Sequence, residues 1–146
     1  MSCDADIVKL QGTPLDVSSA IEGIGVGDSG AIAIFLGITR RDSDSLGREL
    51  VALDYEAYLE MAENQMRGLV EEARRRWQIG RAVLLHRTGF VKVGEPSVLV
   101  AVSTPHRAEA FEACRFLIDQ LKAQATIWKK EVWADGSTSW VDGQRK

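Results

Sequence analysis

Two long stretches of the chain repeat apolar residues at steps of three and four, a spacing typical of amphipathic helices. The first begins near Leu59 and is predicted to end before Gly80. Its apolar positions are Ala62, Met66, Leu69, Val70, Ala73 and Trp77. The second is predicted over residues 105–124. The positions expected to face its core side are Ala110, Phe111, Ala113, Cys114, Leu117, Ile118 and Leu121.

Shorter segments, either continuously apolar or alternating, predict strands. They cover residues 6–10, 31–36, 51–58, 81–86, 97–102, 126–133 and 138–141. A short helix is expected after Pro14, ending before Gly23, and Asp135-Gly136 is a hairpin-turn signal. The Gly and Pro content of residues 89–96 predicts either a bent crossover or a short hairpin. This order of elements indicates an α+β fold with a mixed or antiparallel sheet.

Composition narrows the class of protein. With 146 residues and 45% hydrophobic content, residues 1–146 are expected to form one domain with its own core. A net charge of -3 argues against general nucleic-acid binding, which needs a large basic surface. Neither a secretory signal pattern nor a long apolar run is present, so a soluble cytoplasmic protein without a membrane segment is expected. Two cysteines, Cys3 and Cys114, and two histidines predict neither a disulfide nor a metal site.

The start of the second long helix has an unusual distribution of charge. Thr104 is a good N-cap residue, and Pro105 fits the first helical position. His106 and Arg107 follow in the first turn, where the helix dipole already favours negative charge. Free N–H groups together with two cationic side chains predict a site for a phosphate or carboxylate group.

Other cations are candidates for the same kind of site, and each has a structural alternative. Arg40 follows a buried strand and begins a polar loop, where it and Arg41 are equally explained as solvated residues. Lys122, near a helix end, complements the dipole. Lys129 and Lys130 are consecutive strand residues, so they point to opposite faces and one of them is expected to face solvent.

Three further features have a favoured structural interpretation. The triplet Arg74-Arg75-Arg76 is either an anion patch or, as we favour, a set of cations that complements a helix C-terminus. His86 is interpreted as a structural histidine near a strand end, with a ligand role as the less favoured alternative. Cys114 lies in the core stripe, which favours packing over a nucleophilic role.

The helix geometry limits which cations can act together. His106 and Lys122 are sixteen residues apart on one predicted helix, which is roughly 24 Å at 1.5 Å per residue. They cannot surround one small anion within a single chain. If all these groups serve one site, the helix start of one protomer must meet Arg40, Lys122 and Lys129 of another across a symmetric dimer.

At these residues the sequence strongly resembles the catalytic (large) subunit of molybdopterin synthase. The matching pieces, spread from about residue 30 to 141, are Phe35-Leu-Gly-Ile-Thr-Arg40, Leu53-Asp-Tyr-Glu-Ala-Tyr58, Met61-Ala62, Ala73-Arg-Arg-Arg-Trp77, Gly80-Arg81, His86-Arg87-Thr-Gly89, Val93-Gly-Glu95, Pro105-His-Arg-Ala-Glu-Ala-Phe-Glu-Ala113, Leu121-Lys122 and Ile127-Trp-Lys-Lys-Glu131. Two departures are Thr126-Ile127, where many relatives have Pro-Phe or Pro-Ile, and a short tail after Trp140.

The resemblance implies an α/β-hammerhead fold and a sulfurtransferase. Such enzymes convert cyclic pyranopterin monophosphate (precursor Z) into molybdopterin by installing two sulfurs as a dithiolene. The sulfur arrives as a thiocarboxylate on the C-terminal Gly-Gly of a small ubiquitin-like subunit. The implied assembly is a catalytic homodimer within a heterotetramer, and no cofactor is implied.

The resemblance also implies roles for matched residues. Arg40, His106 and Arg107 would hold the phosphate and pterin, with Phe35 as a wall of the site. Lys122 and Lys129 would carry the chemistry, either as acid or base, as a holder of the thiocarboxylate, or through a transient adduct with the partner's terminal carbonyl. Glu131, on the strand face of Lys129, is expected to orient a basic neighbour.

Two other functions compete with this one. A non-catalytic anion- or nucleotide-binding module would dock a partner's acidic tail through the same cations. A phosphatase-like enzyme is disfavoured because the sequence offers no acid pair, cysteine loop or metal-ligand set for that chemistry.

Overall fold

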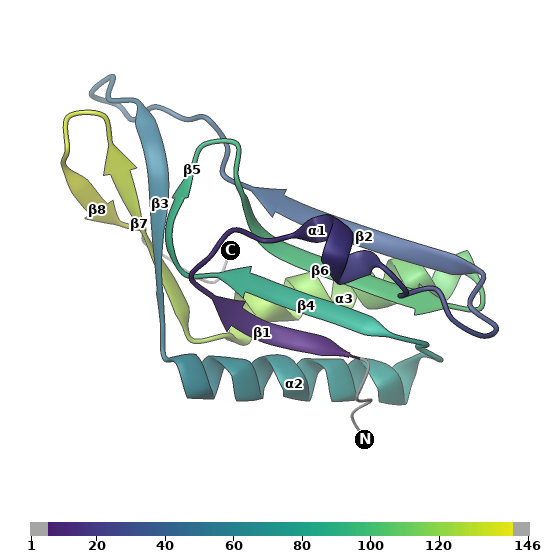
Figure 1. Ribbon diagram of the computed structural model, residues 1–146. Coiled ribbons are helices and arrows are strands. Elements are labelled where there is room, and N and C mark those ends of the chain that lie inside the picture. The colour runs from purple at the N-terminus through teal and green to yellow at the C-terminus, as the bar shows by residue number, and fades with distance from the viewer. Residues whose placement is uncertain (1–5, 142–146) are drawn as a thin grey trace.

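The computed structural model describes residues 6–141, which form two four-stranded sheets and three helices (Figure 1). The strands are β1 (Ile7–Gln11), β2 (Ala31–Ile38), β3 (Leu50–Ala57), β4 (Ala82–Arg87), β5 (Gly89–Lys92), β6 (Pro96–Thr104), β7 (Ile127–Trp133) and β8 (Thr138–Trp140). The helices are α1 (Val17–Ile21), α2 (Leu59–Arg76) and α3 (Arg107–Gln124). The α+β class predicted from the sequence is confirmed.

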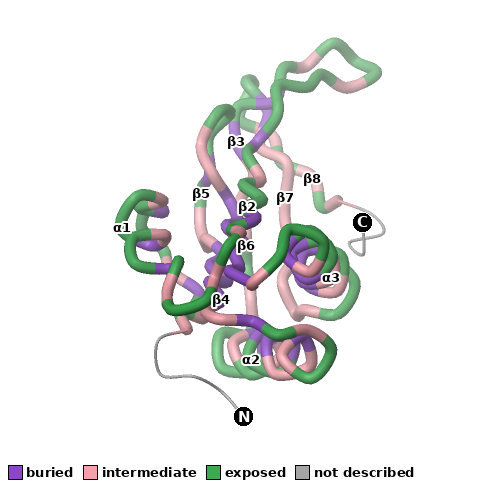
Figure 2. The backbone as a smooth tube through the Cα atoms, turned by 90° about the vertical axis from the view of Figure 1, so that its right-hand side faces the viewer, coloured by how far each residue is buried: buried purple, intermediate pink, exposed green. Residues whose placement is uncertain are grey.

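The first sheet has the order β1-β4-β6-β2 and is mixed. β1 runs parallel to β4, while β6 is antiparallel to both β4 and β2. Helices α2 and α3 cover one face of this sheet, and α1 lies over the other (Figure 2). Because strand side chains alternate, Leu84 and Val100 pack under the long helices, whereas Leu85 and Leu99 pack toward α1.

The second sheet, of order β5-β3-β7-β8, is entirely antiparallel and stands across one end of the first sheet (Figure 1). β3 leads directly into α2, and β7 follows directly after α3. The C-terminal end of α3 therefore meets the second sheet, and this junction contains the lysine residues discussed below. The segment 89–96 is the crossover between the sheets, because β5 pairs with β3 whereas β6 pairs with β4 and β2.

Two details of the predicted second helix are wrong. The helix begins at Arg107 with His106 as its N-cap, and Thr104 is the last residue of β6. The Thr104 hydroxyl donates to the His106 carbonyl at 2.6 Å instead of capping a helical N–H group. Phe111 was placed in the core stripe, but it is 66% exposed. Ala108 and Arg115, three residues before it and four residues after it on the helix, are exposed too, so Phe111 lies on the solvent-facing side of α3.

The arginine triplet at the end of α2 has the structural role that we favoured. Arg74 forms an ion pair with Asp6 at 2.6 Å and donates to the carbonyl groups of Ile79 and Gly80. Arg75 and Arg76 both pair with Glu72. No helix of the described region is long and apolar enough to cross a membrane.

Candidate functional site

Lys122 and Lys129 come together at the junction of α3 with the second sheet. Lys122 lies in the last turn of α3, and Lys129 lies in β7 opposite Tyr55 of β3. The turn between them is anchored by the Gln65 side-chain oxygen, which accepts hydrogen bonds from the backbone N–H and the hydroxyl of Thr126, at 2.8 and 3.1 Å. Both lysines line a cavity of about 50 Å³, here called the lysine cavity. Its polar lining also includes Tyr55, His86 and Ser97.

A wider groove continues outward from the lysine cavity. It has a volume of about 960 Å³, and Tyr55, Ser97, Lys122 and Lys129 line both spaces. The groove adds Phe35, Arg40, Arg41 and Glu131 to the lining. Four of the six site residues expected from the resemblance therefore lie around one continuous space, namely Phe35, Arg40, Lys122 and Lys129.

Arg40 is held at the mouth of this groove by its neighbour Thr39. The Thr39 N–H donates to the Glu95 carbonyl at 3.0 Å, and the Gly94 N–H donates to the Thr39 carbonyl at 2.8 Å. These two backbone hydrogen bonds fix the chain at the point where β2 ends. Gly37, two residues before Thr39, lets the Phe35 ring and Val98 pack closely against the backbone. A Cβ atom at this position would lie 2.7 Å from Val98 and 3.2 Å from the ring.

The electrostatic environment of Lys129 disfavours its ammonium form. Burial lowers the pKa of Lys129, and the positive charges of Lys122 and Arg40 lower it further, whereas Glu131 opposes the shift. A lysine with a lowered pKa keeps more of its neutral form near neutral pH, so it can donate or accept a proton. Lys130 points to the other face of β7, where it pairs with Glu56 at 3.8 Å and lies over the Trp140 ring. The prediction that the two consecutive lysines diverge is confirmed.

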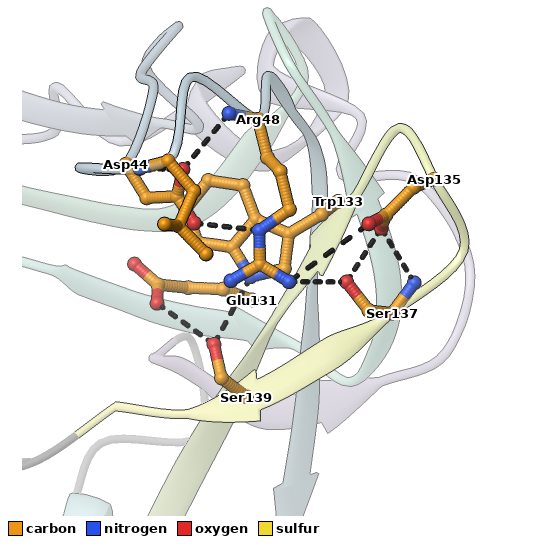
Figure 3. Close-up of polar contacts among 8 residues, drawn as sticks. Asp44, Arg48, Glu131, Trp133, Asp135, Ser137 and Ser139 are labelled. Atoms are coloured by element: carbon orange, nitrogen blue, oxygen red, sulfur yellow. Dashed lines mark hydrogen bonds and ion pairs between the residues drawn. The ribbon is translucent and has the colours of Figure 1, made fainter.

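Glu131 belongs to a polar network that joins the 42–49 loop to the β7-β8 hairpin (Figure 3). Its carboxylate accepts a hydrogen bond from the Ser139 hydroxyl at 3.3 Å, and Ser139 in turn accepts from the indole N–H of Trp133 at 3.0 Å. The guanidinium group of Arg48 lies 5.2 Å from the centre of the Trp133 ring and donates to Asp44 and Ser137, both at 2.6 Å. The loop after Arg40 and the strand of Lys129 are thus tied together through side chains.

His106 and Arg107 lie elsewhere on the protomer. Both are exposed at the N-terminal end of α3, at the opposite end of that helix from Lys122. The rise of an α-helix again gives roughly 24 Å between His106 and Lys122. Within one chain the structure therefore brings His106 and Arg107 together with each other, but not with the lysines.

Three residues of the lysine cavity were not singled out as site residues from the sequence, or were given another role there. Tyr55 and Ser97 are ordinary strand residues by sequence, and His86 was interpreted as structural. The His86 ring makes an edge-to-face contact with Tyr55, with centroids 4.9 Å apart. The pairing of β3 with β7, the pairing of β4 with β6 and the packing of α3 on β6 together place these side chains beside the lysines. The one signal in the sequence that could have indicated these residues is a polar side chain within an otherwise apolar strand.

Cys114 is a core residue, as its place in the apolar stripe predicted. It is buried, and burial raises the pKa of its thiol to about 11. A thiol with this pKa carries almost no thiolate at neutral pH, which makes it a poor nucleophile. Cys3 lies outside the described residues. Within residues 6–141, no group of three or more His, Cys, Asp or Glu side chains is arranged to hold a metal ion.

Comparison with known proteins gives consistent matches along most of the chain. The family described as MoaE protein matches residues 10–124. The molybdopterin synthase catalytic subunit of Thermoplasma volcanium is 43% identical over 135 residues, which is 92% of this chain and 95% of that protein. The bovine molybdopterin synthase catalytic subunit is 41% identical over 135 residues, covering 92% of this chain and 70% of the relative.

Solved structures agree with the sequence matches. Molybdopterin synthase from Staphylococcus aureus has a TM-score of 0.85 and 30% identity, with 92% of this chain and 96% of that chain covered. A complex of subunits 1 and 2 of molybdopterin-converting factor from Helicobacter pylori shares the fold, with a TM-score of 0.72, 21% identity, and 94% and 90% of the two chains covered. The chain therefore belongs to the MoaE protein family of molybdopterin synthase catalytic subunits.

Proposed function

We propose that this protein transfers sulfur from the C-terminal thiocarboxylate of a small ubiquitin-like subunit to cyclic pyranopterin monophosphate, forming the dithiolene of molybdopterin. The observation that carries the proposal is the convergence of Arg40, Lys122 and Lys129 on one groove that narrows into a small cavity. The substrate carries a phosphate and the donor ends in an anionic thiocarboxylate, so both reactants need cationic partners. The buried, inert thiol of Cys114 agrees with a sulfur donor that belongs to a partner.

The roles follow the geometry. Arg40 at the groove mouth binds the phosphate or pterin, and the Phe35 ring forms part of the wall. Lys122 and Lys129 line both the groove and the small cavity, where they would meet the thiocarboxylate end of the partner's tail. Lys129, with its lowered pKa, is the better placed of the two for proton transfer. Glu131 orients Lys129.

We further propose that His106 and Arg107 complete the groove of a neighbouring protomer in a homodimer. The support is the strand β2, which lies at the edge of the first sheet and exposes the side chains of Ile32, Ile34, Leu36 and Ile38. Its first residue pairs with Thr104, near His106, and its last residue lies near Arg40. Antiparallel pairing of two such edges about a two-fold axis would bring the His106 end of one protomer to the Arg40 end of the other.

The lengths involved agree with this arrangement. An eight-residue strand spans roughly 26 Å at 3.3 Å per residue, close to the roughly 24 Å that separates His106 from Lys122 along α3. Each dimer would then contain two complete sites, one at each end of the paired strands. One small subunit at each site gives a heterotetramer. The Helicobacter pylori neighbour, which was solved as a complex of subunits 1 and 2 of molybdopterin-converting factor, supports a partner subunit of another kind.

The direct test is single-turnover formation of the dithiolene from precursor Z and the thiocarboxylated small subunit. We expect Lys122→Ala and Lys129→Ala each to lower the rate by about 100-fold or more while substrate and partner still bind. Lys130→Ala, on the opposite strand face, serves as the matched control and should keep its rate. If both variants bind normally and also keep full turnover, the catalytic assignment of these lysines is wrong.

A further inference from the structure

His86 shares the lysine cavity but is given no role by the proposed function. It is the fifth residue of β4, only 8% exposed, and its side chain lines the same cavity as Lys122 and Lys129. The cavity has room for only a few water molecules. The imidazole and the two lysines therefore border one small space, and the charges of both lysines act on the imidazole.

The hydrogen bonding of the imidazole determines which nitrogen faces the cavity. Nδ1 lies 2.8 Å from the Arg87 carbonyl oxygen. A carbonyl only accepts, so Nδ1 must carry the proton and donate. In a neutral ring Nε2 is then an acceptor with a free lone pair. Within residues 6–141 no side chain or backbone group forms a hydrogen bond with Nε2, and it is not among the fully enclosed polar atoms that lack a partner.

The ring stays neutral at physiological pH. Burial lowers the pKa of His86 to about 4, and the charges of Lys122 and Lys129 also lower it. The hydrogen bond to the Arg87 carbonyl acts in the opposite direction and raises the pKa. Of the two lysines, Lys122 has the larger effect. The charged or titratable groups that border the two connected spaces are Tyr55 from β3, Lys122 from α3, Lys129 and Glu131 from β7, and Arg40, Arg41 and Asp42 after β2.

The two lysines differ in their partners. Lys129 has the carboxylate of Glu131 nearby, which favours its charged form. Lys122 forms no ion pair with any residue in the described part of the chain. Its ammonium group has three N–H donors and shares the cavity with Nε2 of His86 and with the hydroxyl oxygens of Tyr55 and Ser97. Of these acceptors, Nε2 has a lone pair with no hydrogen bond from the described residues.

We propose that His86 is a positioning residue for Lys122, with its neutral Nε2 accepting a hydrogen bond from a water molecule that also contacts the Lys122 ammonium group. The proposal rests on the proposed function for its consequence in catalysis, although the contact itself does not depend on it. A neutral acceptor suits this cavity. A carboxylate in its place would also hold the lysine, but it would repel an incoming phosphate or thiocarboxylate.

The kinetic test compares His86→Asn with His86→Gln. The Asn amide can replace the Nδ1–H donor to the Arg87 carbonyl but does not reach the position of Nε2, whereas the longer Gln side chain places an amide oxygen there. We expect His86→Asn to lower kcat by about 10- to 100-fold with KM within about twofold, and His86→Gln to recover most of the loss. Equal losses in both variants that follow their melting temperatures would show a purely structural role and overturn the proposal.

A second measurement needs no turnover. The chain has two histidines, His86 and His106, so long-range ¹H–¹⁵N spectra of the protein can be assigned with a His106→Asn variant. We expect His86 to show the Nδ1–H form and no titration above about pH 5. Lys122→Met should shift the Nε2 resonance, and Lys129→Met should shift it less. A proton on Nε2, or an Nε2 resonance that Lys122→Met does not shift, would overturn the contact even if the proposed sulfur transfer were correct. Conversely, the expected spectra would support the contact even if the proposed sulfur transfer were wrong.

Discussion

Lys122 and Lys129 line one small cavity, although Lys122 lies in the last turn of α3 and Lys129 lies within β7. Lys129 is half-buried, and the nearby positive charge of Lys122, which is exposed, further disfavours its ammonium form. Such an arrangement lowers the stability of the fold, and it is retained where function requires it. The contrast with the α2 arginines is direct, because Arg74, Arg75 and Arg76 each have a carboxylate partner.

The first prediction concerns stability. Lys129→Met removes the half-buried charge and keeps most of the length of the side chain, so we expect the free energy of unfolding at pH 7 to rise by about 0.5–2 kcal/mol while sulfur transfer is lost. Lys130→Met, which removes a charge paired with Glu56 on the other face, should not stabilise the protein. Chemical denaturation of the three proteins measures both differences. A Lys129→Met protein less stable than the wild type at pH 7 would contradict the electrostatic account of the cavity.

The lowered pKa of Lys129 also determines how the free energy of unfolding changes with pH. The pKa of Lys129 is lower in the folded protein than its ordinary value of 10.5, so the unfolded chain binds the proton more tightly. Between the lowered pKa and 10.5, the free energy of unfolding of the wild type therefore rises with pH relative to that of Lys129→Met. We expect the advantage of the variant to be largest near neutral pH and to shrink as the pH approaches 10.

A second prediction concerns the network around Glu131. Ser139→Ala leaves the indole N–H of buried Trp133 without its acceptor and removes the hydrogen bond to Glu131. We expect the free energy of unfolding to fall by about 1–3 kcal/mol and turnover to fall as well, because Glu131 loses the group that holds it. The exposed neighbour Thr138 provides the control, since Thr138→Ala should change stability by less than about 0.5 kcal/mol. Equal stabilities and rates for the two variants would show that the network does not position Glu131.

A third prediction separates this protein from enzymes that use their own cysteine. Cys114→Ala should lower the free energy of unfolding by about 1 kcal/mol, because a buried side chain is shortened, yet keep its sulfur-transfer rate within about twofold. Thermal unfolding and single-turnover assays measure the two effects. Loss of turnover in a folded Cys114→Ala protein would mean that the thiol carries sulfur, contrary to its burial and raised pKa.

The secondary structure was largely predictable because it depends on local pattern. The repeat in α2 and the apolar runs of β2 and β6 give each element to within about two residues at most ends. The start of α3 could not be predicted correctly, because Thr104 is both a good cap residue and a good strand residue. Its pairing with Ala31 extends β6 and delays the helix. The division into two sheets also depends on long-range pairing, which sequence periodicity does not contain.

The candidate site was predictable only in part. A cationic helix start and the family resemblance pointed to Arg40, His106, Arg107, Lys122 and Lys129, and helix rise alone showed that one chain cannot gather them all. The partners of the lysines could not be found this way. Tyr55, His86 and Ser97 reach the cavity from three different strands, and Ser139 supports Glu131 from a fourth. Their proximity is a property of the tertiary fold.

The sharing of each site between two protomers is the central claim, and mixed dimers test it most directly. One parent carries His106→Ala and Arg107→Ala, the other carries Lys122→Ala and Lys129→Ala, and each is expected to be inactive alone. In a mixed dimer one of the two shared sites has every native residue, so refolding the parents together at equal amounts should restore about a quarter of the wild-type activity by random pairing. Activity that stays at the level of the separate parents, in a preparation shown to contain mixed dimers, would contradict the shared site.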